Sequence, residues 1–523
     1  MKTFPSATRS KIVNSFFVLI SIFLFQAPSF GEEIGDLDLT ELDKYIEEAY
    51  QNWEIPGLAI AIVKNNQIVF SKGYGVTSTE TSKPVDENTI FGIASNTKAM
   101  TAAALAILVD EKKISWDDKV QKYLPWFQLY NHYVSAEMTI RDLLCHRSGL
   151  KTFSGDLLWY ASNYDRNEVI RRARYLEPTF GFRSGFGYSN IMFLTAGQIV
   201  EVVSGESWDD FLITRFFKPL EMVRTSTTIR SLNSAGNYVM GHNKVDGKQL
   251  PIPWVNWDNI APAGSVNSSV LDMSKWMTLQ LNQGTLGDSI YFSKNVSVDM
   301  WTVQNPTKVT ENSMKLMPTK HFSGYGLGWS LYDYHGRKIA THGGGLIGQI
   351  SRVCLVPEEQ LGIVILSNSI NSLPAYLAYE ILDRYFGTEE KDWSNYALQR
   401  TKSYEEKAEQ RRKQEIQNRI TTTIPSLELE EFVGLYSGEL YGDARVSLEN
   451  GKLKVTFVPT PDFTGELSHW QYNTFQIKLS YTTGLPEGKT QFILNDDGKV
   501  SEMKIDIPNP DFHFTELKFM KIN

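Results

Sequence analysis

Ser95 and Lys98 are the first residues of the sequence whose types and spacing suit covalent chemistry. Ser95 begins a stretch rich in Ala and Leu that is nearly all apolar through Val109, and this stretch predicts a buried helix over residues 95–112. Residues three positions apart lie on one face of a helix, so the Lys98 amine can reach the Ser95 hydroxyl. Because burial lowers the pKa of a lysine, Lys98 can serve as the base that a serine nucleophile needs.

The Ser-x-x-Lys spacing is weak evidence by itself, because it occurs again at Ser148–Lys151 and at Ser501–Lys504. Ser148 lies in a glycine turn and Ser501 in a predicted strand, so neither serine starts a buried helix. For Ser95 considered alone, an ordinary helix N-cap is the simpler interpretation. The hypothesis of a nucleophile therefore needs support from other parts of the chain.

A Tyr-x-Asn motif at Tyr188 and Asn190 provides part of that support. It follows a glycine-rich loop over residues 180–187 and precedes an apolar stretch, 191–203, that predicts a helix. A phenol beside a lysine can pass a proton to a leaving group, and an asparagine can hydrogen-bond a substrate amide. The same pattern at residues 50–52 lies in a surface-type helix, so the motif has meaning only in combination.

A third motif, His342-Gly343-Gly344-Gly345, lies late in the chain in a predicted strand. Its glycines let a substrate backbone approach, and the Gly345 N–H can join the amide of the candidate nucleophile as an oxyanion hole. His342 can orient the tyrosine hydroxyl or bind a substrate carboxylate, with a packed histidine and a metal ligand as alternatives. No second histidine or carboxylate stands nearby at ligand spacing, so we expect neither a metal nor another cofactor.

The elements that must bring these motifs together are spread along the chain. Apolar patterning predicts a helix at residues 37–53, followed by strands at 57–63 and 67–74. Residues 116–276 are predicted to be mainly helical. A second set of strands is predicted at 325–368 and a closing helix at 374–386. Strands at both ends with helices between them predict an α/β fold of the α+β type. In that fold, one sheet is assembled from distant pieces and helices cover its faces.

The last part of the sequence has a different character. Residues 402–420 are highly charged with helix-forming composition, which predicts a solvated linker helix rather than a binding surface. After Pro425, short alternating strands separated by turns predict a small all-β domain of the barrel type. We therefore divide the chain into a signal peptide (1–31), a catalytic domain (32–390), a charged helical linker (391–424) and a β domain (425–523).

The N-terminus has the pattern of an export signal. Lys2, Arg9 and Lys11 precede a short apolar core at residues 13–25, and small residues up to Gly31 offer a cleavage site. The apolar run is short for a membrane span, so we expect a cleaved signal peptide and a secreted or periplasmic protein with no stable membrane span after cleavage. An uncleaved N-terminal anchor is the alternative.

Composition excludes other classes of protein. The net charge of −8 argues against nucleic acid as a partner, since no basic excess is present to neutralise phosphates. Cys145 and Cys354 are the two cysteines, which is too few for a disulfide scaffold or a cysteine-based zinc site. Two buried thiols are the preferred interpretation, with one bridge as the alternative.

The three motifs, in their order along the chain, resemble those of the penicillin-recognising serine hydrolases. Within that group the sequence looks like the branch of class C β-lactamases, D-aminopeptidases and esterases. Further matching stretches lie at residues 91–98, 143–150, 261–264, 325–329 and 343–348. The resemblance covers roughly residues 40–385. It implies a mainly antiparallel sheet flanked by helices, an all-helical lobe, and an active site between them.

The resemblance also implies a role for each matching residue. Ser95 would be the nucleophile, and Lys98 and Tyr188 would share the acid–base work. The amides of Ser95 and Gly345 would form the oxyanion hole. The substrate contacts would be Asn190, His342, Gly343 and Gly344. Whether Lys98 or Tyr188 takes the serine proton is left open by the sequence.

One departure from the family pattern bears on the substrate. The β-lactamases of this branch carry Lys-Thr-Gly where this chain has His342-Gly343-Gly344. A largely neutral histidine binds a carboxylate less well than a lysine does. We therefore expect a peptidase of the D-aminopeptidase or carboxypeptidase type, or an esterase, acting on a small peptide, amide or ester. A class C-type β-lactamase and a catalytically silent penicillin-binding-like ligand-binding protein are the alternatives.

The tail from about Glu430 resembles the lipocalin-like domain that some of these hydrolases carry. The matching pieces are residues 432–436, 449–453 and 470–475. Such a domain can shape substrate access or mediate assembly, and a structural cap is an equal alternative. The oligomeric state stays open.

Overall fold

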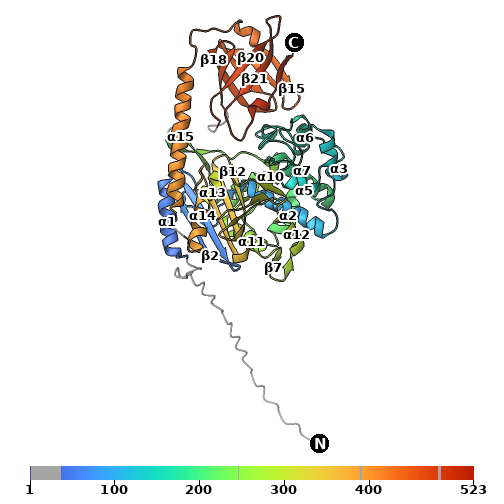
Figure 1. The fold of residues 1–523 in the computed structure, drawn as a ribbon, viewed down its shortest axis with the longest axis vertical. Coiled ribbons are helices and arrows are strands. Elements are labelled where there is room, and N and C mark those ends of the chain that lie inside the picture. The colour runs from blue at the N-terminus through green and yellow to red at the C-terminus, as the bar shows by residue number, and fades with distance from the viewer. Residues whose placement is uncertain (2–36, 246, 389–390, 481–484, 523) are drawn as a thin grey trace.

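The computed structural model describes residues 1, 37–245, 247–388, 391–480 and 485–522. Apart from Met1, the predicted signal peptide lies outside these residues. The described chain forms an α/β unit with a helical lobe and a separate barrel, and one long helix leads from the first to the second (Figure 1). None of the described helices is both long enough and apolar enough to cross a membrane.

The α/β unit is built on an eight-stranded antiparallel sheet in the order β2-β1-β14-β13-β12-β11-β10-β9. Leu58 in β1 lies opposite Ser367 in β14, so strands from the two ends of the unit are neighbours. This confirms the prediction of one sheet assembled from distant pieces. The strands are β1 Gly57–Lys64, β2 Gln67–Gly75, β9 Asn305–Thr307, β10 Ser323–Tyr325, β11 Ser330–Tyr334, β12 Arg337–Leu346, β13 Gln349–Val356 and β14 Leu361–Ser367.

Alternation along the strands explains why helices cover both faces of the sheet. In β1, Leu58 and Ile60 belong to one apolar core, whereas Ala59 and Ala61 belong to the other. One face packs against α1 Leu39–Asn52 and α14 Leu373–Tyr385. The other packs against α2 Thr97–Asp110 and α11 Val270–Leu281. The α/β fold class predicted from the sequence is confirmed.

The helical lobe is centred on α7, Asn190–Ser204, which packs against α2. A two-stranded hairpin, β4 Gly241–Val245 with β5 Lys248–Ile252, interrupts a region that the sequence predicted as mainly helical. The remaining helices and short strands between α2 and β10 are α3 Val120–Tyr123, α4 His132–Glu137, α5 Ile140–Leu144, α6 Arg166–Arg172, α8 Trp208–Leu212, α9 Leu232–Ala235, α10 Ala261–Gly264, α12 Lys294–Met300, α13 Glu311–Leu316, β3 Phe91–Gly92, β6 Asn267–Ser268, β7 Thr285–Leu286 and β8 Ser289–Ile290.

The linker helix α15, Trp393–Gln417, begins earlier than the predicted charged run. Its first turn is capped by Asp392, and Trp393 and Ala397 are buried in the core against α14, whereas most of its later residues are exposed. Beyond it, eight strands close a barrel, as predicted for the β domain. They are β15 Gly434–Gly438, β16 Gly442–Glu449, β17 Lys452–Phe457, β18 Thr460–Gln471, β19 Thr474–Leu479, β20 Gly488–Leu494, β21 Val500–Asp506 and β22 Phe519–Ile522.

The barrel docks on the helical lobe near the loop that precedes α6 (Figure 1). Glu516 accepts hydrogen bonds from the Ser154 hydroxyl at 2.8 Å and from the Gly155 N–H at 2.9 Å. Further contacts join Tyr164 Oη to Tyr441 O at 2.7 Å, Arg172 Nη1 to Glu439 O and Leu440 O at 3.1 Å, and His513 Nε2 to Thr152 O at 2.7 Å. The barrel is therefore attached to the lobe by direct hydrogen bonds as well as through the linker helix α15.

We predict that Glu516→Ala lowers the thermal unfolding midpoint, because it removes two hydrogen bonds to a carboxylate whose side chain is 16% exposed. Each hydrogen bond to a charged group contributes roughly 1–3 kcal/mol to the free energy of unfolding. Glu466→Ala is the control, since Glu466 pairs with Lys452 at a site where both side chains are 62% exposed. Differential scanning calorimetry that gives equal midpoints for the two variants would contradict the prediction.

Candidate active site

Ser95 lies in a 3₁₀ turn, Ala94–Asn96, directly before α2. The sequence predicted a helix from Ser95 onward, but α2 begins at Thr97. The difference has a local cause: Ala94 has φ = 48°, a left-handed conformation that bends the chain between β3 and the helix. Asn96 occupies the N-cap position of α2 and no side chain makes a capping bond there, so Ser95 is not an ordinary cap.

Lys98 lies one turn into this segment, with its side chain fully buried. Its amine contacts three acceptors, Ser95 Oγ at 3.0 Å, Asn190 Oδ1 at 2.7 Å and Ala263 O at 2.8 Å. Burial lowers the pKa of Lys98 well below its ordinary value, and the nearby carboxylate of Asp156 opposes this shift. The arrangement favours a neutral amine beside the serine hydroxyl.

Tyr188 covers the other side of the lysine. The Lys98 amine lies 4.7 Å from the centroid of the Tyr188 ring. Burial raises the pKa of the Tyr188 phenol above its ordinary value, and a hydrogen bond with Ser95 partly counteracts the rise. The phenol therefore keeps its proton near neutral pH and is placed to donate it.

Hydrogen bonds of its backbone hold Tyr188 in place, and no sequence motif marks the groups that make them. Its carbonyl accepts from Phe153 N at 2.8 Å, and its N–H donates to Thr152 Oγ1 at 3.2 Å. The next residue, Ser189, donates its N–H to His146 Nδ1 at 3.0 Å, and the His146 and Tyr188 rings pack with centroids 4.2 Å apart. His146 belongs to a stretch that matched the family, but nothing local in the sequence marked it as a support for the tyrosine.

Asn190 is the first residue of α7 and joins the lysine to a carboxylate that sequence reasoning missed. Its Nδ2 donates to Asp156 Oδ2 at 2.7 Å, while its Oδ1 faces Lys98. Asp156 is 2% exposed and also accepts from Trp159 Nε1 at 2.9 Å. Burial raises the pKa of Asp156 above its ordinary value, whereas the hydrogen bonds from Trp159 and Asn190 and the charge of Lys98 favour its ionised form. Asp156 carries no motif, because only the tertiary fold brings it to the site.

His342 lies on β12 and is neutral. Its Nε2 lies 2.7 Å from Tyr325 Oη, and its Nδ1 lies 2.6 Å from Gly343 O. A carbonyl oxygen only accepts, so Nδ1 carries the proton and Nε2 accepts from the phenol. Burial and the nearby Lys98 lower the pKa of His342 to about 3. The structure thus brings His342 to Tyr325, whereas we expected it to orient Tyr188 or to bind a carboxylate.

The three glycines after His342 do not share one environment. Gly343 and Gly345 line the cavity beside Ser95. Gly344 faces the 3₁₀ turn instead, and a Cβ added there would lie 2.3 Å from Ile93 O and 2.9 Å from Ala94 Cβ. Gly344, which we predicted as a substrate contact, therefore allows the close approach of β12 to the segment that carries the serine.

The site opens into a cavity of about 770 Å³ between the sheet, the helical lobe and the barrel. Ser95, Tyr188, Asn190 and His342 are among its polar lining residues. Its walls are largely aromatic, with Phe153, Trp159, Tyr160, Phe186, Trp257 and Phe512. The barrel contributes Leu485, Asn509, Asp511 and Phe512 to the wall. The motifs are therefore gathered in a cleft that suits an apolar small molecule with a polar reacting group.

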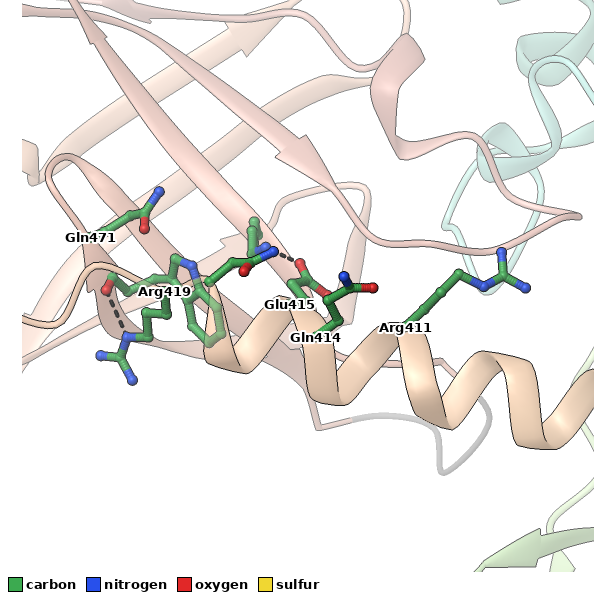
Figure 2. A pocket seen from close by; sticks show the side chains of 8 residues that line it. Arg411, Gln414, Glu415, Arg419 and Gln471 are labelled. Atoms are coloured by element: carbon green, nitrogen blue, oxygen red, sulfur yellow. Dashed lines mark hydrogen bonds and ion pairs between the residues drawn. The ribbon is translucent and has the colours of Figure 1, made fainter.

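A second cavity, of about 350 Å³, lies where the end of α15 meets the barrel (Figure 2). Two of its cations are engaged in the junction: Arg419 donates to Trp470 O at 2.8 Å and to His469 O at 2.9 Å, and Lys489 pairs with Glu415. It shares no lining residue with the cleft at Ser95.

The thiols lie apart from these cavities. Cys145 and Cys354 are both buried and free, which confirms the preferred interpretation of two separate thiols. Neither residue lines the cleft at Ser95.

Comparison with known proteins assigns the family. The Beta-lactamase family model matches residues 42–385, and a domain of unknown function, DUF3471, matches residues 418–521. The chain therefore belongs to the beta-lactamase family. It is similar to the unguisins hydrolases ungD' of Aspergillus campestris (26% identity; 76% of this chain and 73% of the relative) and ungD of Aspergillus violaceofuscus (27%; 80% of each).

The chain is similar to two further proteins. Protein flp of Staphylococcus aureus is 29% identical over 63% of this chain and 62% of its own length. The structure of the octameric penicillin-binding protein homologue from Pyrococcus abyssi aligns with a TM-score of 0.61 at 22% identity, and the alignment covers 93% of this chain and 100% of that one. The second likeness supports the fold.

We predict that Gly344→Ala lowers both the thermal midpoint and the reactivity of Ser95, because the new methyl group would displace the backbone at Ile93. Gly345→Ala is the matched control for stability, since an added Cβ there has its nearest contact at 3.5 Å from Ile350 Cδ1. Overpacking of this kind costs roughly 1–3 kcal/mol. Calorimetry that finds Gly344→Ala as stable as Gly345→Ala would show that the close approach does not exist.

We also predict that His342 makes the protein less stable in mild acid. An unfolded histidine titrates near a pKa of about 6.5, whereas folding lowers the pKa of His342 to about 3. The unfolded state therefore binds more protons between these pH values. The free energy of unfolding falls as the pH is lowered, by at most about 1.4 kcal/mol per pH unit. His342→Gln should reduce the fall in unfolding midpoint between pH 7 and pH 4, and an undiminished fall would contradict this.

Proposed function

We propose that this protein is a serine hydrolase that cleaves amide or ester bonds through an acyl-enzyme on Ser95. The observation that carries the proposal is the contact of Lys98 Nζ with Ser95 Oγ at 3.0 Å, made by a lysine that is fully buried. A serine hydroxyl is a weak nucleophile until an adjacent base accepts its proton. Membership of the beta-lactamase family and the hydrolase names of two relatives agree with this chemistry.

In the acylation step, Lys98 takes the proton of Ser95 as Oγ attacks the carbonyl carbon of the substrate. The two pKa shifts support this assignment, because burial favours the neutral form of the amine and the protonated form of the Tyr188 phenol. Tyr188 then gives its proton to the leaving nitrogen or oxygen as the scissile bond breaks. The amides of Ser95 and Gly345 are proposed to stabilise the oxyanion.

In the deacylation step, water attacks the acyl ester and transfers a proton to the Tyr188 phenolate. The Lys98 ammonium returns its proton to Ser95 Oγ as the ester bond breaks. Both residues thereby regain their starting protonation states, and the acid product leaves. The proton transfers thus balance over Ser95, Lys98, Tyr188, the leaving group and water.

The neutral state of His342 directs the choice of substrate class. A cation at this position would bind the carboxylate of a β-lactam, but His342 has a pKa near 3 and both of its ring nitrogens are occupied. The aromatic cleft instead suits an apolar group next to the scissile bond. We therefore place the enzyme among the peptidases of D-aminopeptidase or carboxypeptidase type and the esterases of this family, ahead of the β-lactamases.

We further propose that the C-terminal barrel is of the lipocalin-like kind and shapes access to the cleft. Asn509, Asp511 and Phe512 lie on one loop of the barrel and line the same cavity as Ser95. The N-terminal sequence supports export, so we propose a secreted or periplasmic enzyme whose partner is a small peptide, amide or ester.

Ser95→Ala is expected to abolish labelling of the full-length protein by a fluorophosphonate and to lower hydrolysis of a reactive aryl ester by at least roughly a thousand-fold. Ser501→Ala is the matched control: Ser501 also begins a Ser-x-x-Lys sequence, but it lies on β21 in the barrel and should label at the wild-type rate. Labelling retained in Ser95→Ala would remove Ser95 from its role.

The same pair of variants can identify the substrate class. We expect D- or L-aminoacyl amides or short-chain esters to be turned over by wild type and by Ser501→Ala, and not by Ser95→Ala. Rapid turnover of a chromogenic cephalosporin would instead favour a β-lactamase. Tight ligand binding without any turnover would favour a silent binding protein, and either result would contradict the proposed substrate class.

A further inference from the structure

Asp156 is a buried carboxylate beside the reacting groups, and the proton transfers described above do not use it. It begins a short 3₁₀ turn, Asp156–Leu158, after Gly155. Each of its oxygens accepts one hydrogen bond, Oδ1 from Trp159 Nε1 at 2.9 Å and Oδ2 from Asn190 Nδ2 at 2.7 Å. A carboxylate with so little exposure and two fitted donors is a built feature of the site rather than a surface charge.

The bond to Asp156 determines which way the Asn190 amide points. A side-chain amide has one accepting oxygen and one donating nitrogen, and either end can face a given neighbour. The hydrogen bonds from Trp159 and Asn190 favour the ionised form of Asp156, and in that form the carboxylate only accepts. The nitrogen of Asn190 therefore faces Asp156. The oxygen of Asn190 is thereby turned toward the Lys98 amine, 2.7 Å away.

The amide orientation in turn determines how the Lys98 amine is oriented. Asn190 Oδ1 and Ala263 O can only accept, so two N–H groups of Lys98 point at them. A neutral amine has two N–H groups and one lone pair, and the lone pair is left for the third partner. That partner is Ser95 Oγ at 3.0 Å, the only one of the three that carries a proton to give.

We propose that Asp156 is a positioning residue for the nucleophile: by fixing the amide of Asn190, it directs the lone pair of Lys98 at the hydroxyl of Ser95. The inference rests on the proposed hydrolase function and deepens it. Without the carboxylate, the Asn190 amide is free to turn its nitrogen toward Lys98, and the lysine lone pair would then be drawn away from the serine.

Asp156 also acts on Lys98 through its charge, which provides a second readout. The titratable groups that interact electrostatically with Asp156 are Lys98, Tyr188 and Asp511. An ionised Asp156 favours the charged form of Lys98 and so raises the pKa of the lysine. A neutral side chain in its place lowers that pKa, so the acid limb of the acylation rate moves to lower pH.

The test measures the rate at which a fluorophosphonate labels Ser95 in the full-length protein. Asp156→Ala and Asn190→Ala are each expected to slow labelling by roughly 10- to 100-fold, as is typical for residues that orient a reacting group. Because Asp156 acts through Asn190, the double variant should be no slower than Asn190→Ala alone. Asp165→Ala is the control, since it removes an exposed carboxylate of the same lobe that caps α6, and it should label at the wild-type rate.

A third variant, Asp156→Asn, keeps the shape of the side chain and removes its charge. It is expected to recover part of the rate lost in Asp156→Ala and to move the acid limb of the rate profile to lower pH. A residue with a merely structural role would change the unfolding midpoint without moving that limb. If Asp156→Ala fails to fold, the pH profile of Asp156→Asn decides the question, and an unmoved limb overturns the inference.

The outcomes separate this inference from the proposed function. If wild-type protein is not labelled at Ser95, the proposed hydrolase mechanism fails, and the role of Asp156 fails with it. If wild type is labelled and Asp156→Ala reacts at the wild-type rate, only the inference is overturned. It is also overturned if the losses in Asp156→Ala and Asn190→Ala multiply in the double variant.

Discussion

The architecture of this protein depends on the complete burial of one amine. An isolated ammonium is costly to remove from water, so a lysine in such a place is held neutral rather than charged. Lys98 meets this condition with no exposure and with partners from three separate parts of the chain, Ser95, Asn190 and Ala263. The same burial that is unfavourable for a cation makes the amine a useful base.

The fold supplies this burial by enclosing α2 on every side. Half of the 14 residues of the helix are Ala or Leu, and nearly all of its residues are buried. Its neighbours are α7 and α10 from the helical lobe, with β12 closing over the 3₁₀ turn that holds Ser95. Small side chains let these elements approach closely, as Gly344 does against Ile93. The site is therefore formed where the sheet packs against the helical lobe.

The sequence predicted the parts of the site that are local and missed those that arise only in three dimensions. A Ser-x-x-Lys spacing at the start of an apolar helix follows from helical geometry, and β12 follows from strand alternation. Asp156 and His146 have no such pattern, because each is a single polar residue that long-range packing brings to the site. Likewise, the partner of His342 was not predictable, since Tyr325 reaches it across the sheet.

The division of labour between the two units follows from where their residues lie. Ser95, Lys98 and Tyr188 all come from the α/β unit and its lobe, whereas the barrel contributes only to the wall of the cleft. The barrel also contacts the lobe through Glu516, which accepts hydrogen bonds from Ser154 and Gly155 directly before Asp156. A displacement of the barrel would therefore be felt first by the loop that carries this carboxylate, and through Asn190 by the lysine. The contact with the barrel and the carboxylate that holds Asn190 thus lie next to each other in one short stretch of chain.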